Sequence, residues 1–233
     1  MSTYSPVYLF ADSQLLFWTQ HAQLFLKSIL SFITDENPSA AYIGASNGDE
    51  QEYYQLFEAA MESIGINNCR MILSEFSEQD KNFLEQANIV LLAGGDVKKG
   101  WDIFESSGIK EAVHKRYNDG AVLMGISAGA VQLGTCSLYG DDNKLLTTFQ
   151  ILPFIIDVHN EKDEWSALIK TLKIKDGFEK GIGIPSGAGF IYHPDHTVEP
   201  LRHALTEISL KEGNLSTGLL FPGSEKEAPE PIH

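Results

Sequence analysis

The sequence predicts an α/β protein of three layers, in which a mostly parallel sheet is covered by helices on both faces. Two observations support this: short apolar runs typical of buried strands, and intervening stretches whose apolar residues recur three or four positions apart, as in helices. Alternation of strand and helix favours a parallel sheet. Five strands are expected in the first part of the chain: Pro6–Phe10, Ala40–Ile43, Cys69–Leu73, Ile89–Ala93 and Ala121–Met124.

Helices are expected between these strands. The first begins near Asp12 or Ser13, either of which suits an N-cap, and continues to about Leu30. The others are Glu50–Ile64, Ser77–Ala87 and Lys98–Lys115, the last interrupted near Ser107-Gly108. Loops of small residues, Gly44–Asp49 and Gly94–Asp96, follow two of the strands. They would lie at the carboxyl edge of the sheet, where α/β proteins place binding groups.

The second half of the chain predicts a C-terminal β extension. A turn-rich hairpin or loop at Ser137–Lys144, a strand at Ile155–His159 and a helix at Glu161–Leu172 come first. Further strands are expected at Gly181–Ile184, Gly189–Tyr192, Thr197–Leu201, Glu207–Leu210 and Thr217–Phe221. Residues 1–222 would form a single hydrolytic domain, and the Pro/Glu-rich segment 223–233 a disordered tail.

Composition excludes several classes of function. The net charge of −15 over 233 residues argues against nucleic acid as a partner, because phosphates require clustered Lys and Arg. No basic leader and no apolar run of about 18 residues is present, so we expect a cytoplasmic protein without a membrane span. Cys69 and Cys136 lack the spacing of a disulfide framework or a zinc site, and no metal or organic cofactor is predicted. The sequence does not decide whether the chain forms a homodimer.

The most informative stretch is Gly125-Ile126-Ser127-Ala128-Gly129-Ala130, which follows an apolar strand and precedes a helix. A strand that turns sharply through Gly-x-Ser-x-Gly into a helix is the pattern of a nucleophile elbow, which leaves the serine hydroxyl exposed. The alternative is a glycine-rich turn whose serine only caps the helix.

A serine nucleophile needs a base, and histidine is the usual one. His159 ends a predicted strand beyond the elbow, where it could reach Ser127 if the strand ends share one edge; the alternative is a turn histidine. The oxyanion hole would use the N–H of Ala128 and, from the preceding loop, that of Gly95. Gly95 is equally compatible with a simple tight turn.

These elements resemble peptidase family S51. The resemblance rests on Ile89–Asp96, Gly125–Ala130 and Asp157-Val158-His159, and it extends over about Ala40–Pro200. The family contains dipeptidase E and cyanophycinase and belongs to the class I glutamine amidotransferase-like superfamily. The resemblance implies a flavodoxin-like sheet, a nucleophile at Ser127, a base at His159 and oxyanion donors at Gly95 and Ala128.

The sequence departs from the family in the residue that would orient the histidine. Family members carry a carboxylate in a downstream strand end, where this chain has Ser186. Asp157, Glu161, Asp195 or Glu199 could substitute, or a neutral group could suffice. Dipeptidase E also needs an aspartate between serine and histidine, and Asp142 or its neighbour Asp141 falls there, although a solvated turn explains both equally.

A second departure concerns the substrate. Aspartyl dipeptidases follow their histidine with arginines that bind a substrate carboxylate, whereas Asn160–Trp165 holds one lysine among acids. We therefore expect a serine peptidase acting on a small peptide, without strict preference for N-terminal aspartate. The alternative is a binding or regulatory protein with an incomplete triad. An amidotransferase subunit is disfavoured, because that chemistry normally uses a cysteine at the elbow.

Overall fold

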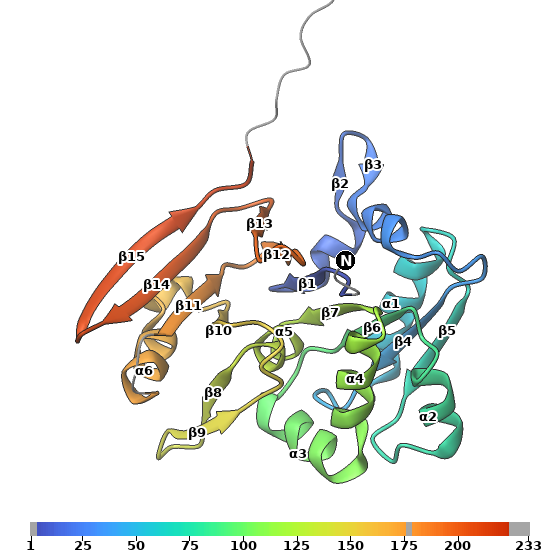
Figure 1. Ribbon diagram of the computed structural model, residues 1–233, viewed down its shortest axis with the longest axis horizontal. Helices are drawn as coiled ribbons and strands as arrows, with labels where there is room; N and C mark the ends of the chain where they lie inside the picture. The colour runs from blue at the N-terminus through green and yellow to red at the C-terminus, as the bar shows by residue number, and fades with distance from the viewer. Residues whose placement is uncertain (1–3, 176–178, 224–233) are drawn as a thin grey trace, which may run out of the picture.

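The computed structural model describes residues 4–175 and 179–223 of the chain, and so leaves 224–233, most of the predicted tail, outside. Its centre is a seven-stranded sheet in the order β13-β12-β1-β7-β6-β4-β5 (Figure 1). The five predicted strands are confirmed and run parallel: β1 (Val7–Phe10), β4 (Ser39–Ile43), β5 (Asn68–Ile72), β6 (Ile89–Leu92) and β7 (Val122–Ile126). Antiparallel β12 (Gly189–Tyr192) and β13 (Val198–Leu201) extend the β1 side.

Most helices form where the periodicity predicts them: α1 (Gln51–Glu62), α2 (Glu78–Leu84), α3 (Val97–Ser107), α4 (Ile109–Asn118), α5 (Ala128–Leu133) and α6 (Ser166–Ile174), the last preceded by the 3-10 turn η3 (Glu161–Asp163). The predicted break between α3 and α4 is confirmed. Gly108 separates them with φ of 88°, a left-handed conformation that glycine adopts without a Cβ clash.

The prediction of one long first helix is wrong. Residues 13–32 form two 3-10 helices, η1 (Ser13–Phe17) and η2 (Phe25–Phe32), with a small hairpin of β2 (Thr19–Gln20) and β3 (Gln23–Leu24) between them. His21 and Ala22 have φ of 50° and 60°, which a helix does not allow. Both 3-10 segments still bury leucine or isoleucine side chains, so the apolar spacing indicated burial but not one helix. Asp12, one of the two predicted N-cap residues, caps η1 in the structure.

A second sheet, in the order β10-β11-β14-β15, lies beside the first (Figure 1). It consists of β10 (Ile155–Val158), β11 (Glu179–Ile184), β14 (Leu205–Lys211) and β15 (Asn214–Leu220). The predicted hairpin before it is β8 (Cys136–Tyr139) and β9 (Lys144–Thr147). The strand that carries His159 therefore belongs to the second sheet, which corrects the expectation that it shares a sheet edge with the elbow.

The two sheets share one hydrophobic core. Val7 and Leu9 of β1 belong to the same buried cluster as Ile156 of β10 and Ile182 and Ile184 of β11. Another cluster lies under η1, η2 and α1, and a smaller one lies between α6 and the second sheet. In the part of the chain that the structure describes, every helix is too short or too polar to cross a bilayer.

Candidate active site

Ser127 occupies a sharp turn between β7 and α5. Its φ of 49° and ψ of −111° lie outside the regions that L-residues normally adopt, and such strain is concentrated at functional sites. The turn requires its glycines, since a Cβ at Gly125 would lie 2.7 Å from the backbone nitrogen of Ala130, and one at Gly129 would overlap the carbonyl of Leu92. The Ser127 side chain makes no capping hydrogen bond, so helix capping does not explain this serine.

Two backbone N–H groups flank Ser127 without acceptors. Over the described residues, neither the N–H of Gly95 nor that of Ala128 donates a hydrogen bond. Gly95 has φ of 131°, and a Cβ there would overlap the carbonyl of Ser46, so only glycine fits. Its neighbour Gly94 packs against Ser127, because a Cβ at Gly94 would lie 3.3 Å from that of Ser127. The N–H groups of Gly95 and Ala128 could therefore stabilise an oxyanion.

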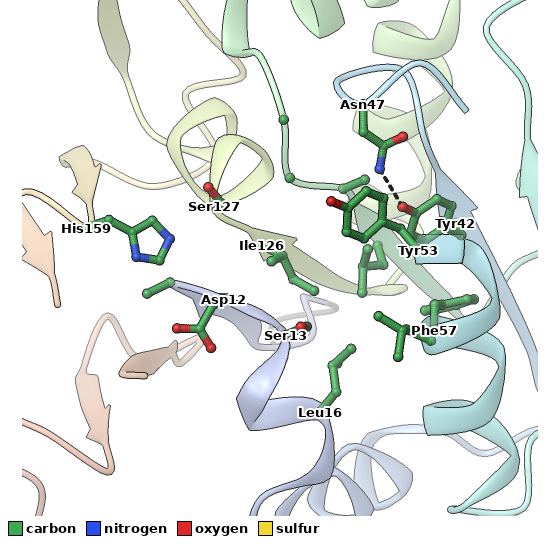
Figure 2. Close-up of a pocket in the computed structure, with 16 residues that line it drawn as sticks. Asp12, Ser13, Leu16, Tyr42, Asn47, Tyr53, Phe57, Ile126, Ser127 and His159 are labelled. Atoms are coloured by element: carbon green, nitrogen blue, oxygen red, sulfur yellow. Dashed lines mark hydrogen bonds between the residues drawn. The ribbon is translucent and has the colours of Figure 1, made fainter. Parts of the chain in front are cut away.

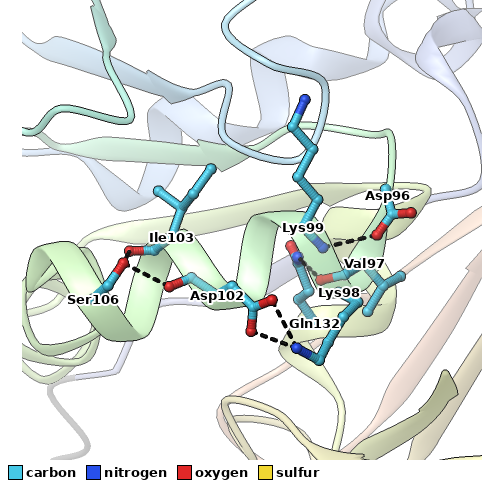
Figure 3. Close-up of polar contacts among 8 residues, drawn as sticks. All are labelled: Asp96, Val97, Lys98, Lys99, Asp102, Ile103, Ser106 and Gln132. Atoms are coloured by element: carbon cyan, nitrogen blue, oxygen red, sulfur yellow. Dashed lines mark hydrogen bonds and ion pairs between the residues drawn. The ribbon is translucent and has the colours of Figure 1, made fainter. Parts of the chain in front are cut away.

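Buried hydrogen bonds hold the Gly95 loop in place. The N–H of Asp96 donates to the Ser46 carbonyl at 2.8 Å. Gln132 of α5 is fully buried, and its Nε2 donates to the Ser46 hydroxyl at 3.1 Å. The same nitrogen donates to the Val97 carbonyl at 3.0 Å (Figure 3). Asp96 caps α3 by accepting from the N–H of Lys99 at 2.8 Å. The loop beside the nucleophile is thus tied to the helix behind it.

His159 directly follows β10, and its ring lies near Ser127 at the mouth of a shared cavity (Figure 2). Its backbone, with φ of 59°, donates to the Ile184 carbonyl at 3.2 Å. Ring atom Nδ1 lies 3.3 Å from the Ser186 hydroxyl. No hydrogen bond joins His159 to Ser127 in the described structure. Catalytic hydrogen bonds are often long in the free enzyme, so this arrangement is compatible with a base.

Ser186 connects His159 to a carboxylate. Parallel pairing of Val158 with Ile184 brings the two strand ends together, which places Ser186 beside the histidine. The N–H of Ser186 donates to Oε1 of Glu161 at 3.2 Å. Partial burial opposes ionisation of Glu161, but its own N–H, Ser186 and nearby His159 outweigh burial and lower its pKa. Glu161 is therefore an anion near the histidine that does not touch it directly.

The other predicted carboxylates do not contact the imidazole. Asp157 accepts from the N–H of Val158 at 2.9 Å and from Nδ2 of Asn160 at 3.0 Å, and burial raises its pKa. Asp142, like its neighbour Asp141, is exposed in the β8–β9 turn, where its carboxylate pairs with Lys144 at 2.7 Å. Asp195 accepts from Thr197, and Glu199 pairs with His193.

Two features of the site escaped sequence reasoning. Asp12, predicted only as a cap, also accepts from the N–H of Gly187 at 2.7 Å and so binds the loop that carries Ser186. The second is an apolar cavity of about 300 Å³ that opens on Ser127. The lining of this cavity comes from segments far apart in the sequence, so no local pattern predicts it. For Asp12, its position just after a strand was the one sequence signal that it could belong to the site. Across the described residues, no His, Cys, Asp or Glu cluster could hold a metal ion.

Comparison with known proteins gives a consistent result. The model of peptidase family S51 matches residues 11–199. An uncharacterized peptidase of Bacillus subtilis, YgaJ, is 24% identical over 104 residues, and the match spans 44% of this chain and less than half, 45%, of that relative.

Two crystal structures share the fold. A peptidase from an acI-B1 Actinobacterium has a TM-score of 0.70 at 16% identity, with 92% of this chain and 97% of that chain covered. A "Putative Peptidase E Protein" from Listeria monocytogenes EGD-e has a TM-score of 0.62 at 13% identity, with 85% and 98% covered. At these identities the likeness concerns the mixed α/β architecture with its central, mostly parallel sheet.

Proposed function

The chain belongs to peptidase family S51, and from that premise we propose that it is a serine-type peptidase cleaving a peptide or amide bond of a small peptide. The observation that carries this proposal is the setting of Ser127. Its strained turn leaves the hydroxyl uncapped between the free N–H groups of Gly95 and Ala128, with His159 at the same cavity. Residues 1–222 would act as one hydrolytic domain.

The chemistry follows from these positions. His159 takes the proton of the Ser127 hydroxyl as Oγ attacks the substrate carbonyl, and the oxyanion accepts hydrogen bonds from Gly95 and Ala128. The C–N bond then breaks, and the imidazolium gives its proton to the leaving amine. Water, deprotonated by His159, hydrolyses the acyl-enzyme and restores Ser127. No cofactor enters this scheme.

The Ser186 hydroxyl would act as the positioning group for His159. It can accept a hydrogen bond from Nδ1–H, which leaves Nε2 unprotonated and free to act as base. Glu161, bonded to the Ser186 backbone, would stabilise the imidazolium through its charge. His159 would thus contact the neutral Ser186 hydroxyl, with the Glu161 carboxylate behind Ser186, where a triad histidine contacts a carboxylate directly.

Active-site labelling tests the proposal. A small fluorophosphonate should react with the wild-type protein at Ser127, which intact-protein and peptide mass spectrometry would locate. Ser127→Ala should abolish both labelling and peptide turnover. Labelling that persists in Ser127→Ala, or turnover that survives it, would contradict the assignment.

A second candidate is a binding or regulatory protein that keeps the fold without catalysis. The neutral Ser186 beside His159, and the lack of a hydrogen bond between Ser127 and His159 in the described structure, favour it. It predicts that wild type and Ser127→Ala bind the same peptides with equal affinity and that neither hydrolyses them. Turnover by the wild type alone would exclude it.

A further inference from the structure

The apolar cavity beside Ser127 has walls that select for a class of substrate side chain. Its lining includes Ser127, His159 and Gly95, so a side chain bound in it would belong to a residue next to the scissile bond. Figure 2 shows the cavity extending away from His159 between η1, β4 and α1. Its apolar and aromatic lining is contributed by Leu16, Tyr42, Tyr53, Leu56, Phe57 and Leu91.

Two polar side chains of this cavity, Tyr42 and Asp12, are already engaged. The Tyr42 hydroxyl accepts from Asn47 at 2.8 Å, and burial raises its pKa to about 12, so it stays neutral. Both Asp12 oxygens accept backbone hydrogen bonds, one from Gln14 at 2.9 Å and one from Gly187 at 2.7 Å. No lysine or arginine lines the cavity as described, so a substrate carboxylate would lose its hydration without gaining a counter-ion.

A second cavity at Ser127, of about 290 Å³, offers no cation either. It contains the half-buried carboxylate of Asp157, and its described lining includes neither lysine nor arginine. Lys98 and Lys99 line an adjoining, open hollow that shares Gly95 with both cavities, and Lys98 is paired with Asp102 at 2.6 Å. An acidic side chain at the scissile bond would therefore find no partner in either cavity.

We propose that the cavity between η1, β4 and α1 selects a bulky apolar or aromatic side chain in the substrate residue next to the scissile bond, and that it disfavours an acidic one. This inference rests on the proposed peptidase activity. A volume of about 300 Å³ lies at the lower end of the range for small-ligand clefts, about 300–1,000 Å³, which suits one side chain with its backbone. Side-chain contacts of this kind change kcat/KM by about tenfold or more.

The test combines substrate panels with a matched pair of variants. Dipeptides X-Ala and Ala-X, and the corresponding tripeptides, carry Phe, Leu, Ala or Asp at X, and kcat/KM is measured by mass spectrometry of the products. Leu56 lies on the rim with 43% of its surface exposed, so Leu56→Arg adds a cation to the cavity without disturbing the core. Gln55→Arg adds the same charge to the same helix outside the cavity.

In the wild type, Phe or Leu should exceed Asp by about tenfold or more in at least one panel. Leu56→Arg should reduce that ratio at least tenfold, and Gln55→Arg should leave it unchanged. Asp equal to or better than Phe in every panel would overturn the inference, as would equal effects of the two arginine variants.

Two further readouts separate this inference from the proposed activity. Fluorophosphonate labelling of Ser127 should be retained in both arginine variants, and its absence from the wild type would count against the peptidase itself. Titration calorimetry with Ser127→Ala measures the cavity without turnover. Tighter binding of the Phe peptides than of the Asp peptides supports the inference, and equal or no binding refutes it.

Discussion

Replacing Ser186 with alanine tests how the histidine is held. The substitution removes the hydroxyl that lies 3.3 Å from Nδ1 but keeps the backbone N–H that donates to Glu161, so the loop should stay in place. A hydrogen bond between neutral partners contributes about 0.5–1.5 kcal/mol, and about 1.4 kcal/mol corresponds to a factor of ten. We therefore expect kcat/KM to fall about 2- to 12-fold. Loss of the aspartate from a Ser-His-Asp triad costs far more, about 10⁴-fold in kcat.

The role of Glu161 is tested by Glu161→Gln, which keeps an oxygen for the Ser186 N–H and removes the charge. A nearby anion stabilises the imidazolium that forms during catalysis, so its removal should lower kcat/KM.

Both variants are assayed as kcat/KM against pH and by the rate of fluorophosphonate labelling. Ser216→Ala, an exposed serine on the edge strand β15, is the matched control and should behave as wild type. A loss of 10³-fold or more in Ser186→Ala, or no loss of kcat/KM in either variant, would refute this account of how His159 is positioned.

Two further substitutions act on the scaffold. Gly95→Ala places a Cβ against the Ser46 carbonyl at a φ of 131°, so the loop must move, and we expect labelling and turnover to fall at least 100-fold with folding retained by circular dichroism. Asp80→Asn removes the negative charge of a carboxylate that has 3% side-chain exposure and accepts a hydrogen bond from Arg70 at 2.8 Å. This substitution should lower the free energy of unfolding, measured in urea at pH 7, by about 1–2 kcal/mol.

The control for the second substitution is Asp102→Asn, which breaks an exposed helical pair and should cost less than about 0.5 kcal/mol. Burial opposes ionisation of Asp80, but Arg70 and Ser77 outweigh it and lower the pKa. The stabilisation is therefore present above the unfolded pKa of about 3.9 and is lost as pH falls below it. An Asp80→Asn deficit that persists unchanged to pH 3 would contradict the ionic explanation. Full activity of Gly95→Ala would exclude its N–H from the site.

The sequence predicted those parts of the fold that depend on local patterns. Buried parallel strands are continuous apolar runs, and the break at Gly108 needs only one residue with positive φ, so both were accessible. The error at residues 13–32 has the same origin. Two 3-10 segments and a tight hairpin satisfy the same three-to-four spacing of buried residues as one helix, and no glycine or proline marks the turn at His21-Ala22.

The site was predictable only in part, for a different reason. Ser127, Gly95 and Ala128 are adjacent to strand ends of one parallel sheet, so chain order alone predicts their proximity. The contact of His159 with Ser186 depends on the register of β10 against β11 in another sheet, which apolar patterning does not determine. The cavity depends on side chains from η1, β4, α1 and β6, whose packing no local pattern encodes.

The placement of His159 relative to Ser127 depends on the end of β1. Ser127 and His159 follow strands of different sheets, so hydrogen bonds between neighbouring strands cannot fix their separation. The N–H of Ser127 donates to the Phe10 carbonyl at 2.9 Å, and one residue later the N–H of Ala11 donates to Ala188 at 2.9 Å. Asp12 then binds the N–H of Gly187, next to the serine that contacts His159. Three consecutive residues, 10–12, thus connect the turn at Ser127 to the loop beside His159, so the end of β1 helps to set the distance between the proposed nucleophile and the proposed base.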